Sequence, residues 1–186
     1  MADRFGVTVF LHGRLNKGWA GQTLERAIGL PISSYGGPDG GDWELKLTSL
    51  RSVRGSLAPK ETMAITMLDP DDVAAHRFSE SRLYRKLAHM IVCGRVFENR
   101  QESRSILAAV GTFDLERTTL ERVQTDYDLV REALRTSGFD SLTGRMGELI
   151  QPRTKGSGHG STSRAFYARK GFVAHLLGLS TIISPS

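Results

Sequence analysis

Residues 42–50 read DWELKLTSL, and this stretch decides the fold class that the sequence predicts. Its apolar residues Trp43, Leu45 and Leu47 alternate with polar ones. A period of two is typical of a strand that buries one face and exposes the other. We therefore expect a strand here, with Glu44 and Lys46 projecting side by side from the face opposite the core.

The pattern of the flanking residues predicts how this strand is embedded. A loop rich in glycine precedes it at 33–41, and residues 61–68 are expected to pair with it as a hairpin, followed by a turn at 69–72. Helices are predicted at 17–28, 79–87 and 116–136, and further strands at 89–98, 106–115 and 144–151. Strands flanked by helices indicate an α/β or α+β fold.

Length and composition point to one compact domain over residues 1–186. The chain has 186 residues, of which 39% are hydrophobic, enough for one core. Its single cysteine, Cys93, excludes an internal disulfide framework and fits a reducing cytoplasm. The apolar runs fall far short of the roughly 20 residues of a membrane span, and the first residues lack the pattern of a signal peptide.

The net charge of +5 is concentrated at the end of the chain. Residues 149–186 contain no Asp or Glu, whereas the charges of residues 1–148 cancel. The basic residues of this segment are Arg153, Lys155, Arg164, Arg169 and Lys170. A basic segment on a neutral body is typical of a protein that binds a polyanion, most often nucleic acid, although a solvated basic surface would look the same.

A pattern of two acids and a lysine surrounds the start of the predicted strand. Asp39, Glu44 and Lys46 form D-x4-E-x-K, and the glycine-rich loop can fold back to bring Asp39 beside Glu44. Two carboxylates at one point form an oxygen-ligand site for Mg²⁺, and a nearby lysine can orient a water and offset charge on a phosphate. The pattern therefore predicts phosphodiester hydrolysis; the alternative is an ion pair on a solvated strand.

Several blocks of the sequence resemble the MutH mismatch-repair endonucleases and their type II restriction-enzyme relatives. The blocks, in chain order, are KGWAGQTLE (17–25), WELK (43–46), SRLYRKL (81–87), PRTKG (152–156) and RAFYARKGF (164–172). The resemblance implies a PD-(D/E)XK nuclease fold, an α/β architecture with a central mixed sheet flanked by helices. It also implies Mg²⁺-dependent cleavage of double-stranded DNA, with Mn²⁺ able to substitute, at a short site such as GATC.

The resemblance assigns roles to individual residues. Glu44 and Lys46 match the catalytic Glu and Lys of the family, Glu25 an auxiliary active-site glutamate, and Lys86 an active-site lysine. Without the resemblance, Glu25 would be interpreted as a solvated helix residue and Lys86 as a surface lysine. Catalysis is thus expected from Glu25, Asp39, Glu44, Lys46 and Lys86.

The metal-binding aspartate is the one departure from the family pattern. In MutH-like members this Asp lies seven residues before the Glu, a position that Gly37 occupies here. Asp39 and Asp42 are the candidates, and Asp39 is preferred because the related BcnI-like enzymes show the same D-x4-E-x-K spacing. The expected metal ligands are Asp39, Glu44 and the Leu45 carbonyl.

DNA contacts are expected from the basic segment. Arg153, Lys155, Arg164, Arg169 and Lys170 can neutralise backbone phosphates, and Arg153 and Lys155 can also read guanine. Tyr167 matches a residue with which the family senses the target base; buried packing is its alternative role. Gly156, Gly158 and Gly160 would let the backbone approach DNA closely.

The resemblance leaves the biological role open. We expect a compact type II restriction enzyme with a cognate methyltransferase, because the chain has little before its first active-site block and nothing like an allosteric domain after its last. A mismatch-repair endonuclease that nicks one strand is the first alternative. A DNA-binding module that has lost cleavage is the second. The protein is expected to be a monomer in solution or a dimer on DNA.

Overall fold

A computed structural model describes residues 1–30, 37–155 and 163–180. Its strands are β1 (Phe10–Leu11), β2 (Arg14–Leu15), β3 (Glu44–Val53), β4 (Ser56–Pro59), β5 (Met63–Leu68), β6 (His89–Phe97), β7 (Ser105–Asp114), β8 (Ile150–Thr154) and β9 (Arg164–Ala168). Its α-helices are α1 (Trp19–Ala27), α2 (Pro70–Ala75), α3 (Arg82–Ala88), α4 (Arg117–Ser137) and α5 (Lys170–Leu176). Short 3₁₀ turns lie at Asp3–Phe5, Phe78–Glu80 and Phe139–Ser141.

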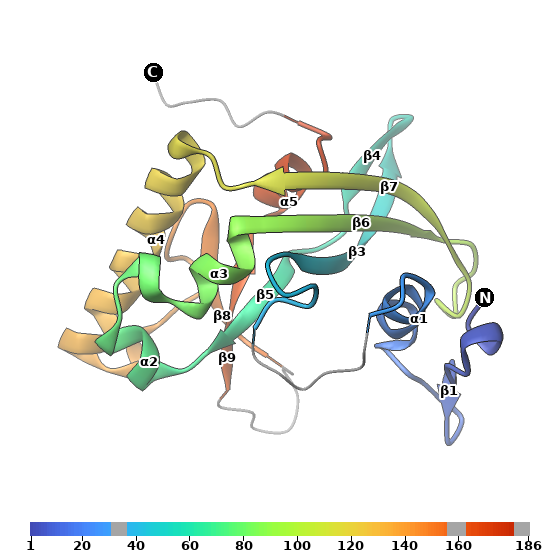
Figure 1. Ribbon diagram of the computed structural model, residues 1–186, viewed down its shortest axis with the longest axis horizontal. Helices are drawn as coiled ribbons and strands as arrows, with labels where there is room; N and C mark the ends of the chain where they lie inside the picture. The colour runs from blue at the N-terminus through green and yellow to red at the C-terminus, as the bar shows by residue number, and fades with distance from the viewer. Residues whose placement is uncertain (31–36, 156–162, 181–186) are drawn as a thin grey trace.

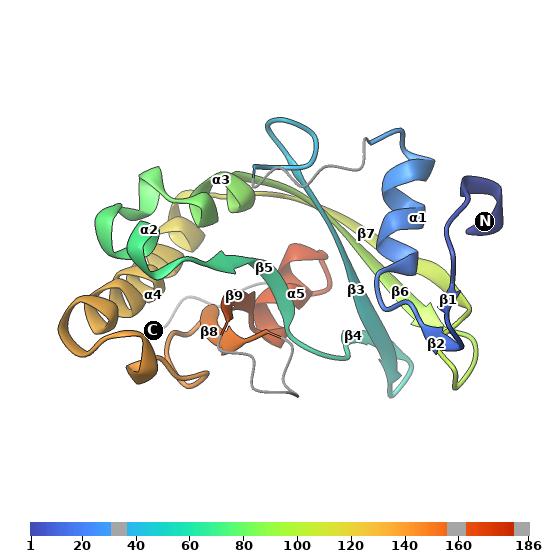
Figure 2. The same cartoon turned by 90° about the horizontal axis from the view of Figure 1, so that it is seen from below.

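The strands form a mixed sheet with a smaller antiparallel sheet beside it. The mixed sheet has the order β4-β3-β6-β7, in which β3 and β6 run parallel and the other pairs antiparallel. The smaller sheet has the order β5-β9-β8. Helix α1 lies at one end of the molecule and α2 and α4 at the other (Figures 1 and 2). The predicted α/β fold with a mixed sheet and flanking helices is confirmed.

The predicted hairpin between 42–50 and 61–68 is wrong. Strand β3 turns back at once into β4, because Arg54 and Gly55 both adopt positive φ (51° and 84°). Two consecutive residues with positive φ form the tight turn that joins antiparallel strands. Strand β5, the predicted partner, pairs instead with β9.

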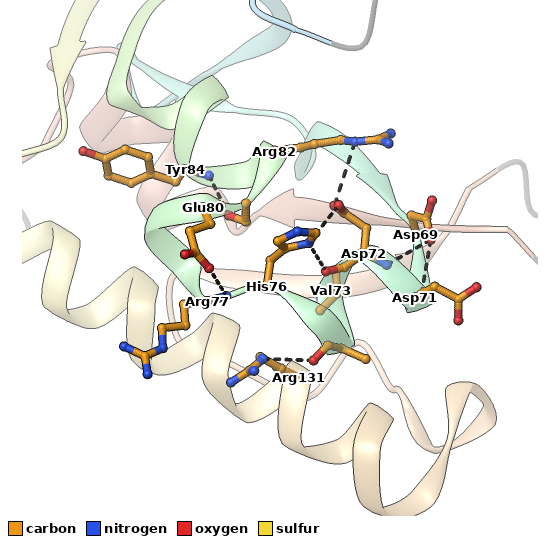
Figure 3. Close-up of polar contacts among 12 residues, drawn as sticks. Asp69, Asp71, Asp72, Val73, His76, Arg77, Glu80, Arg82, Tyr84 and Arg131 are labelled. Atoms are coloured by element: carbon orange, nitrogen blue, oxygen red, sulfur yellow. Dashed lines mark hydrogen bonds and ion pairs between the residues drawn. The ribbon is translucent and has the colours of Figure 1, made fainter.

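The predicted turn at 69–72 is the start of helix α2. The Asp69 side chain accepts hydrogen bonds from the backbone N–H groups of Asp71 and Asp72, at 3.2 and 3.3 Å (Figure 3). Pro70 occupies the first helical turn, where a missing N–H costs nothing. An aspartate followed by proline is therefore a helix cap here.

The main core lies between the sheets and helix α4. Helix α4 packs on this core through an apolar stripe, in which Val123, Tyr127 and Val130 are all 0% exposed. The Tyr127 ring stacks on Phe166 of β9, with ring centroids 5.8 Å apart. Helix α4 thus holds the smaller sheet in place.

A second, smaller hydrophobic cluster lies beside α1. It contains Ala2, Val7, Trp19 and Ala20, and Leu47 of β3 packs against it. Helix α1 therefore packs against β3, the strand that carries Glu44 and Lys46. Among the described residues, no helix has the length and apolar character to span a membrane.

Candidate active site

Glu44 is the first residue of β3, and its side chain is completely buried (0% exposed). Alternation predicted Leu45 as the inward residue and Glu44 as the outward one, but both are buried, because α3 covers the face from which Glu44 projects. Lys86 of α3 donates hydrogen bonds from Nζ to both Glu44 carboxylate oxygens, each at 2.8 Å. Lys46 Nζ makes an ion pair with Glu44 Oε1. A buried charge needs such partners.

Helix α3 places Lys86 over the strand. Ser81 caps the helix by accepting a hydrogen bond from Tyr84 N–H at 3.1 Å, and Leu83 and Leu87 anchor it in the core. Lys86 follows Leu83 by three residues, so both lie on the same face of the helix. Its side chain is 11% exposed, which is inconsistent with a plain surface lysine.

The loop before β3 brings Asp39 to the start of that strand, as the glycine-rich sequence predicts. Asp39 Oδ2 accepts a hydrogen bond from the Leu45 backbone N–H at 3.1 Å. The loop closes through Gly40 N–H, which donates to the Trp43 carbonyl at 2.9 Å. A Cβ at residue 40 would lie 2.0 Å from the Trp43 ring, so the position requires glycine. Asp42 is exposed and precedes the strand, so it does not share the strand face of Glu44.

Glu25 approaches the same group of charges from the last turn of α1. Burial raises the pKa of the Glu25 carboxyl, the negative charges of Asp39 and Glu44 raise it further, and Lys46 opposes them. These interactions place Glu25 within electrostatic reach of the other three residues. The candidate active site thus gathers three carboxylates and two lysines from α1, the loop before β3, β3 itself and α3.

Mg²⁺ fits the donor set of this site. Among the described residues, no group of three or more His, Cys, Asp or Glu side chains is arranged to hold a metal ion. Mg²⁺ does not need such a group: it is usually bound through one or two carboxylates and completes its shell with water and substrate phosphate. Asp39 and Glu44 supply two carboxylates at one strand end.

Comparisons with known proteins find similarity to the MutH family. The family model described as DNA mismatch repair enzyme MutH matches residues 38–126. The DNA mismatch repair protein MutH of Haemophilus influenzae (strain PittGG) is 23% identical over 202 residues, covering 100% of this chain and 89% of that protein. MutH of Vibrio parahaemolyticus is 24% identical over 169 residues, covering 89% and 74%. The predicted resemblance to the MutH-type endonucleases is confirmed.

The segment that matches the MutH model contains four of the five charged residues of the site. Residues 38–126 include Asp39, Glu44, Lys46 and Lys86, whereas Glu25 precedes them. The basic segment at 149–186 lies beyond the matched range but within the similarity to the H. influenzae protein, which covers the whole chain.

Two arginines of the basic segment hold neighbouring parts of the fold together. Arg169 donates to the carbonyls of Gly144, Met146 and Gly147, each at 3.0 Å. Arg164 donates to the Leu142 carbonyl, and its guanidinium lies 4.8 Å from the centroid of the Phe139 ring. Both predicted DNA contacts therefore have structural partners.

Other members of the basic segment are more accessible. Arg153, Lys155 and Lys170 are exposed. Arg153 donates to Thr62 Oγ1 at 2.8 Å and lies over the Tyr167 ring, 5.7 Å from its centroid. Tyr167 is half-buried, whereas its neighbour Phe166 is 1% exposed and belongs to the core. The predicted role of Gly156, Gly158 and Gly160 lies outside the described residues.

Sequence reasoning missed Asp126. Its buried carboxylate accepts hydrogen bonds from the backbone N–H groups of residues 148, 149 and 150, at 2.7, 2.7 and 2.9 Å. These hydrogen bonds fix the start of β8, which is also the start of the basic segment at 149–186. The available signal was an acid on the apolar stripe of α4, three residues after Val123.

Proposed function

We propose that this protein is a DNA endonuclease that depends on a divalent metal and nicks duplex DNA in mismatch repair. The observation that carries the proposal is the buried Glu44 carboxylate, paired with Lys46 and Lys86 at the strand end where Asp39 folds back. The relatives reported above are named as mismatch-repair proteins. This favours the nicking role over the type II restriction enzyme that the sequence analysis placed first.

Asp39 and Glu44, with the Leu45 carbonyl, would hold Mg²⁺ or Mn²⁺. When bound, such an ion supplies Lewis-acid polarisation of a phosphoryl oxygen. The side chains present are hard oxygen donors, which suit Mg²⁺ better than the softer transition metals. Asp39 is preferred to Asp42 because its carboxylate already lies at the Leu45 backbone N–H.

Lysine and glutamate side chains would carry the remaining chemistry. The Lys46 ammonium would orient the attacking water and offset negative charge that develops on the phosphate. In the reaction, the water oxygen would bond to phosphorus and release a proton to solvent, while one bridging P–O bond breaks and the departing sugar oxygen keeps the bonding electron pair and takes up a proton from solvent to form a hydroxyl. Lys86 would hold the Glu44 carboxylate in position, and Glu25 would complete the site from α1.

Double-stranded DNA is the expected partner. Arg153, Lys155 and Lys170 are exposed and would neutralise phosphates, while Tyr167 would face the target base from β9. Arg164 and Arg169 would shape this surface through their backbone contacts rather than touch DNA. Because phosphate contacts release counterions, DNA affinity should fall steeply with salt.

A plasmid assay tests the proposal. Supercoiled plasmid with many short sites, methylated or unmethylated, is incubated with the protein and Mg²⁺ or EDTA. We expect nicked circles with Mg²⁺ only, no product with Glu44→Ala or Lys46→Ala, and gel-shift binding by both variants. Asp42→Asn serves as the matched control and should still nick.

Each other outcome identifies an alternative. Linear product from single binding events would favour a restriction enzyme. DNA binding without cleavage, and without a shift in melting temperature on adding Mg²⁺, would favour a module that has lost catalysis. Full cleavage by Glu44→Ala would overturn the proposal.

A further inference from the structure

The N-terminal end of α1 is fastened to the turn between β6 and β7. Trp19, the first residue of the helix, donates from its indole N–H to the Glu102 carbonyl at 3.3 Å. The Arg95 guanidinium of β6 lies over the Trp19 ring, 5.5 Å from its centroid, and over the Phe97 ring, 4.6 Å from its centroid. A cation over two aromatic rings attracts both.

Glu102 connects this contact to the rest of the mixed sheet. Its carboxylate accepts a hydrogen bond from Lys60 Nζ at 2.7 Å. Lys60 follows β4, donates its backbone N–H to the Ser49 carbonyl of β3 at 2.8 Å, and places its ammonium 5.1 Å from the centroid of the Phe97 ring. We call Trp19, Lys60, Arg95, Phe97 and Glu102 the Trp19 clamp.

The backbone at Glu102 is strained. Its φ is +58°, a conformation that residues other than glycine rarely adopt. Such strain persists only where surrounding contacts fix it, and it gathers at sites with a function. At Glu102 these contacts are the Trp19 indole, the Lys60 ammonium and the hydrogen bond of the turn itself, which Glu102 N–H donates to the Asn99 carbonyl at 3.2 Å.

Arg95 adds a second unusual feature. Among the described residues, its Nη1 is buried without a hydrogen-bond partner. Burial lowers the pKa of its guanidinium, and the charges of Glu102 and Glu61 act in the opposite direction. Because one nitrogen of this buried guanidinium has no hydrogen-bond partner, the two aromatic rings are its main favourable contacts. One of these rings belongs to Trp19, the first residue of α1.

The clamp matters for the active site because α1 also carries Glu25. Glu25 lies six residues after Trp19, about 9 Å along the helix axis. A tilt of about 10° at the Trp19 end would therefore move Glu25 by roughly 1.5 Å, and a misplacement of that size can cost about 100-fold in rate.

We infer that Arg95 and Glu102 are positioning residues that act through Trp19 to hold Glu25 beside Asp39, Glu44 and Lys46. This inference rests on the proposed nuclease function. It gives a function to a cluster that lies outside the charged residues of the site. Neither the D-x4-E-x-K motif nor the family blocks predict that these residues meet.

A double-mutant cycle tests the inference. We expect Arg95→Met to lower the cleavage rate at saturating DNA by about tenfold, with DNA affinity unchanged, because only the placement of Glu25 is lost. In a Glu25→Gln background the same substitution should change the rate less than about twofold, since the residue it positions is already disabled. Arg95→Lys, which keeps the cation, should recover part of the rate.

A matched control separates positioning from general loss of stability. Arg131→Met removes a half-buried arginine whose Nε donates to the Ala74 carbonyl at 3.3 Å, at the end of the molecule opposite α1 (Figures 1 and 3). It should leave the rate unchanged. Trp19→Phe keeps an aromatic ring for Arg95 but replaces the bicyclic indole with a smaller phenyl ring that has no N–H donor for the Glu102 carbonyl, so it tests the clamp even if Arg95→Met folds poorly.

Fluorescence follows the clamp without any reference to cleavage. The chain has two tryptophans, so Trp43→Phe leaves Trp19 as the reporter. In this background Arg95→Met should shift the emission to longer wavelength and increase quenching by acrylamide. Equal losses of rate in both Glu25 backgrounds, or an unchanged Trp19 spectrum, would overturn the inference. A wild-type protein that cleaves no DNA would instead refute the proposed function on which the inference rests.

Discussion

Lys86→Met removes one of the two cations that pair with the buried Glu44 carboxylate. Lys86 Nζ lies 2.8 Å from each Glu44 oxygen, and its side chain is only 11% exposed. Methionine is unbranched and flexible, so it fills the same space without the charge. The substitution therefore isolates the electrostatic part of the contact.

The expected size of the effect follows from burial. Opposite charges about 4 Å apart attract by roughly 4 kcal/mol at an effective dielectric constant near 20. Removing one partner of a buried pair costs about 3–5 kcal/mol, because the other charge stays buried without compensation. Since Lys46 still pairs with Glu44, we expect about half of this, roughly 2 kcal/mol. At this chain length that loss lowers the melting temperature by roughly 4–8 °C.

Urea unfolding of four proteins measures the pair: wild type, Lys86→Met, Glu44→Gln and the double variant. The double variant should recover most of the stability, because neither charge is then left unpaired, although it should not cleave DNA. Lys17→Met, at an exposed lysine, is the control and should stay within about 0.5 kcal/mol of wild type. A Lys86→Met protein as stable as this control, or a double variant showing the simple sum of both losses, would refute the reasoning.

Three further predictions concern the metal, β8 and Tyr127. Asp39→Asn should weaken Mg²⁺ binding, measured by the rise in melting temperature on titration with the ion, whereas Asp42→Asn should not; equal effects would reject Asp39 as the ligand. Asp126→Asn, which disturbs two buried and one partly buried hydrogen bond to the backbone, should cost about 2–4 kcal/mol in urea unfolding. Burial raises the pKa of Tyr127 to about 12, so the stability it contributes is complete below about pH 10 and is lost as the pH rises toward 12. An absorbance titration should show one tyrosine that ionises late in the wild type, and Tyr127→Phe should lack it.

Local sequence pattern predicts several elements within one or two residues at each end. Helix α4 is expected at 116–136 and lies at Arg117–Ser137, and its apolar positions repeat at a helical period. Strands β6 and β7 also lie where expected, although β6 is marked by a continuous apolar run at 90–93 rather than by alternation. Periodicity does not specify strand partners, however. The positive φ of Arg54 and Gly55 gave β3 the nearest possible partner, β4.

In the candidate site, too, contacts between residues close in sequence can be predicted and contacts between distant residues cannot. Asp39, Glu44 and Lys46 are close in sequence, so their spacing alone predicts that they meet, and the structure brings Asp39 to the start of β3. The burial of Glu44 could not be predicted in this way, because it depends on Lys86, 42 residues later. The Trp19 clamp is harder still to predict, since its members are distributed over more than 80 residues and, of these, Trp19 alone lies in a block that resembles the family.

The net charge of the site agrees with the proposal that it binds a metal ion before it binds DNA. Three carboxylates (Glu25, Asp39 and Glu44) face two lysines (Lys46 and Lys86), so the group is formally negative by one charge. A polyanion would be repelled by such a site, whereas a divalent cation reverses its sign and makes it attractive to phosphate. Lys86 and Lys46 keep the net negative charge of the site small. Without them, the buried Glu44 carboxylate would cost more free energy than the folded protein gains by burying it. The two lysines therefore let the fold tolerate a buried carboxylate at this strand end, where we propose that the metal binds.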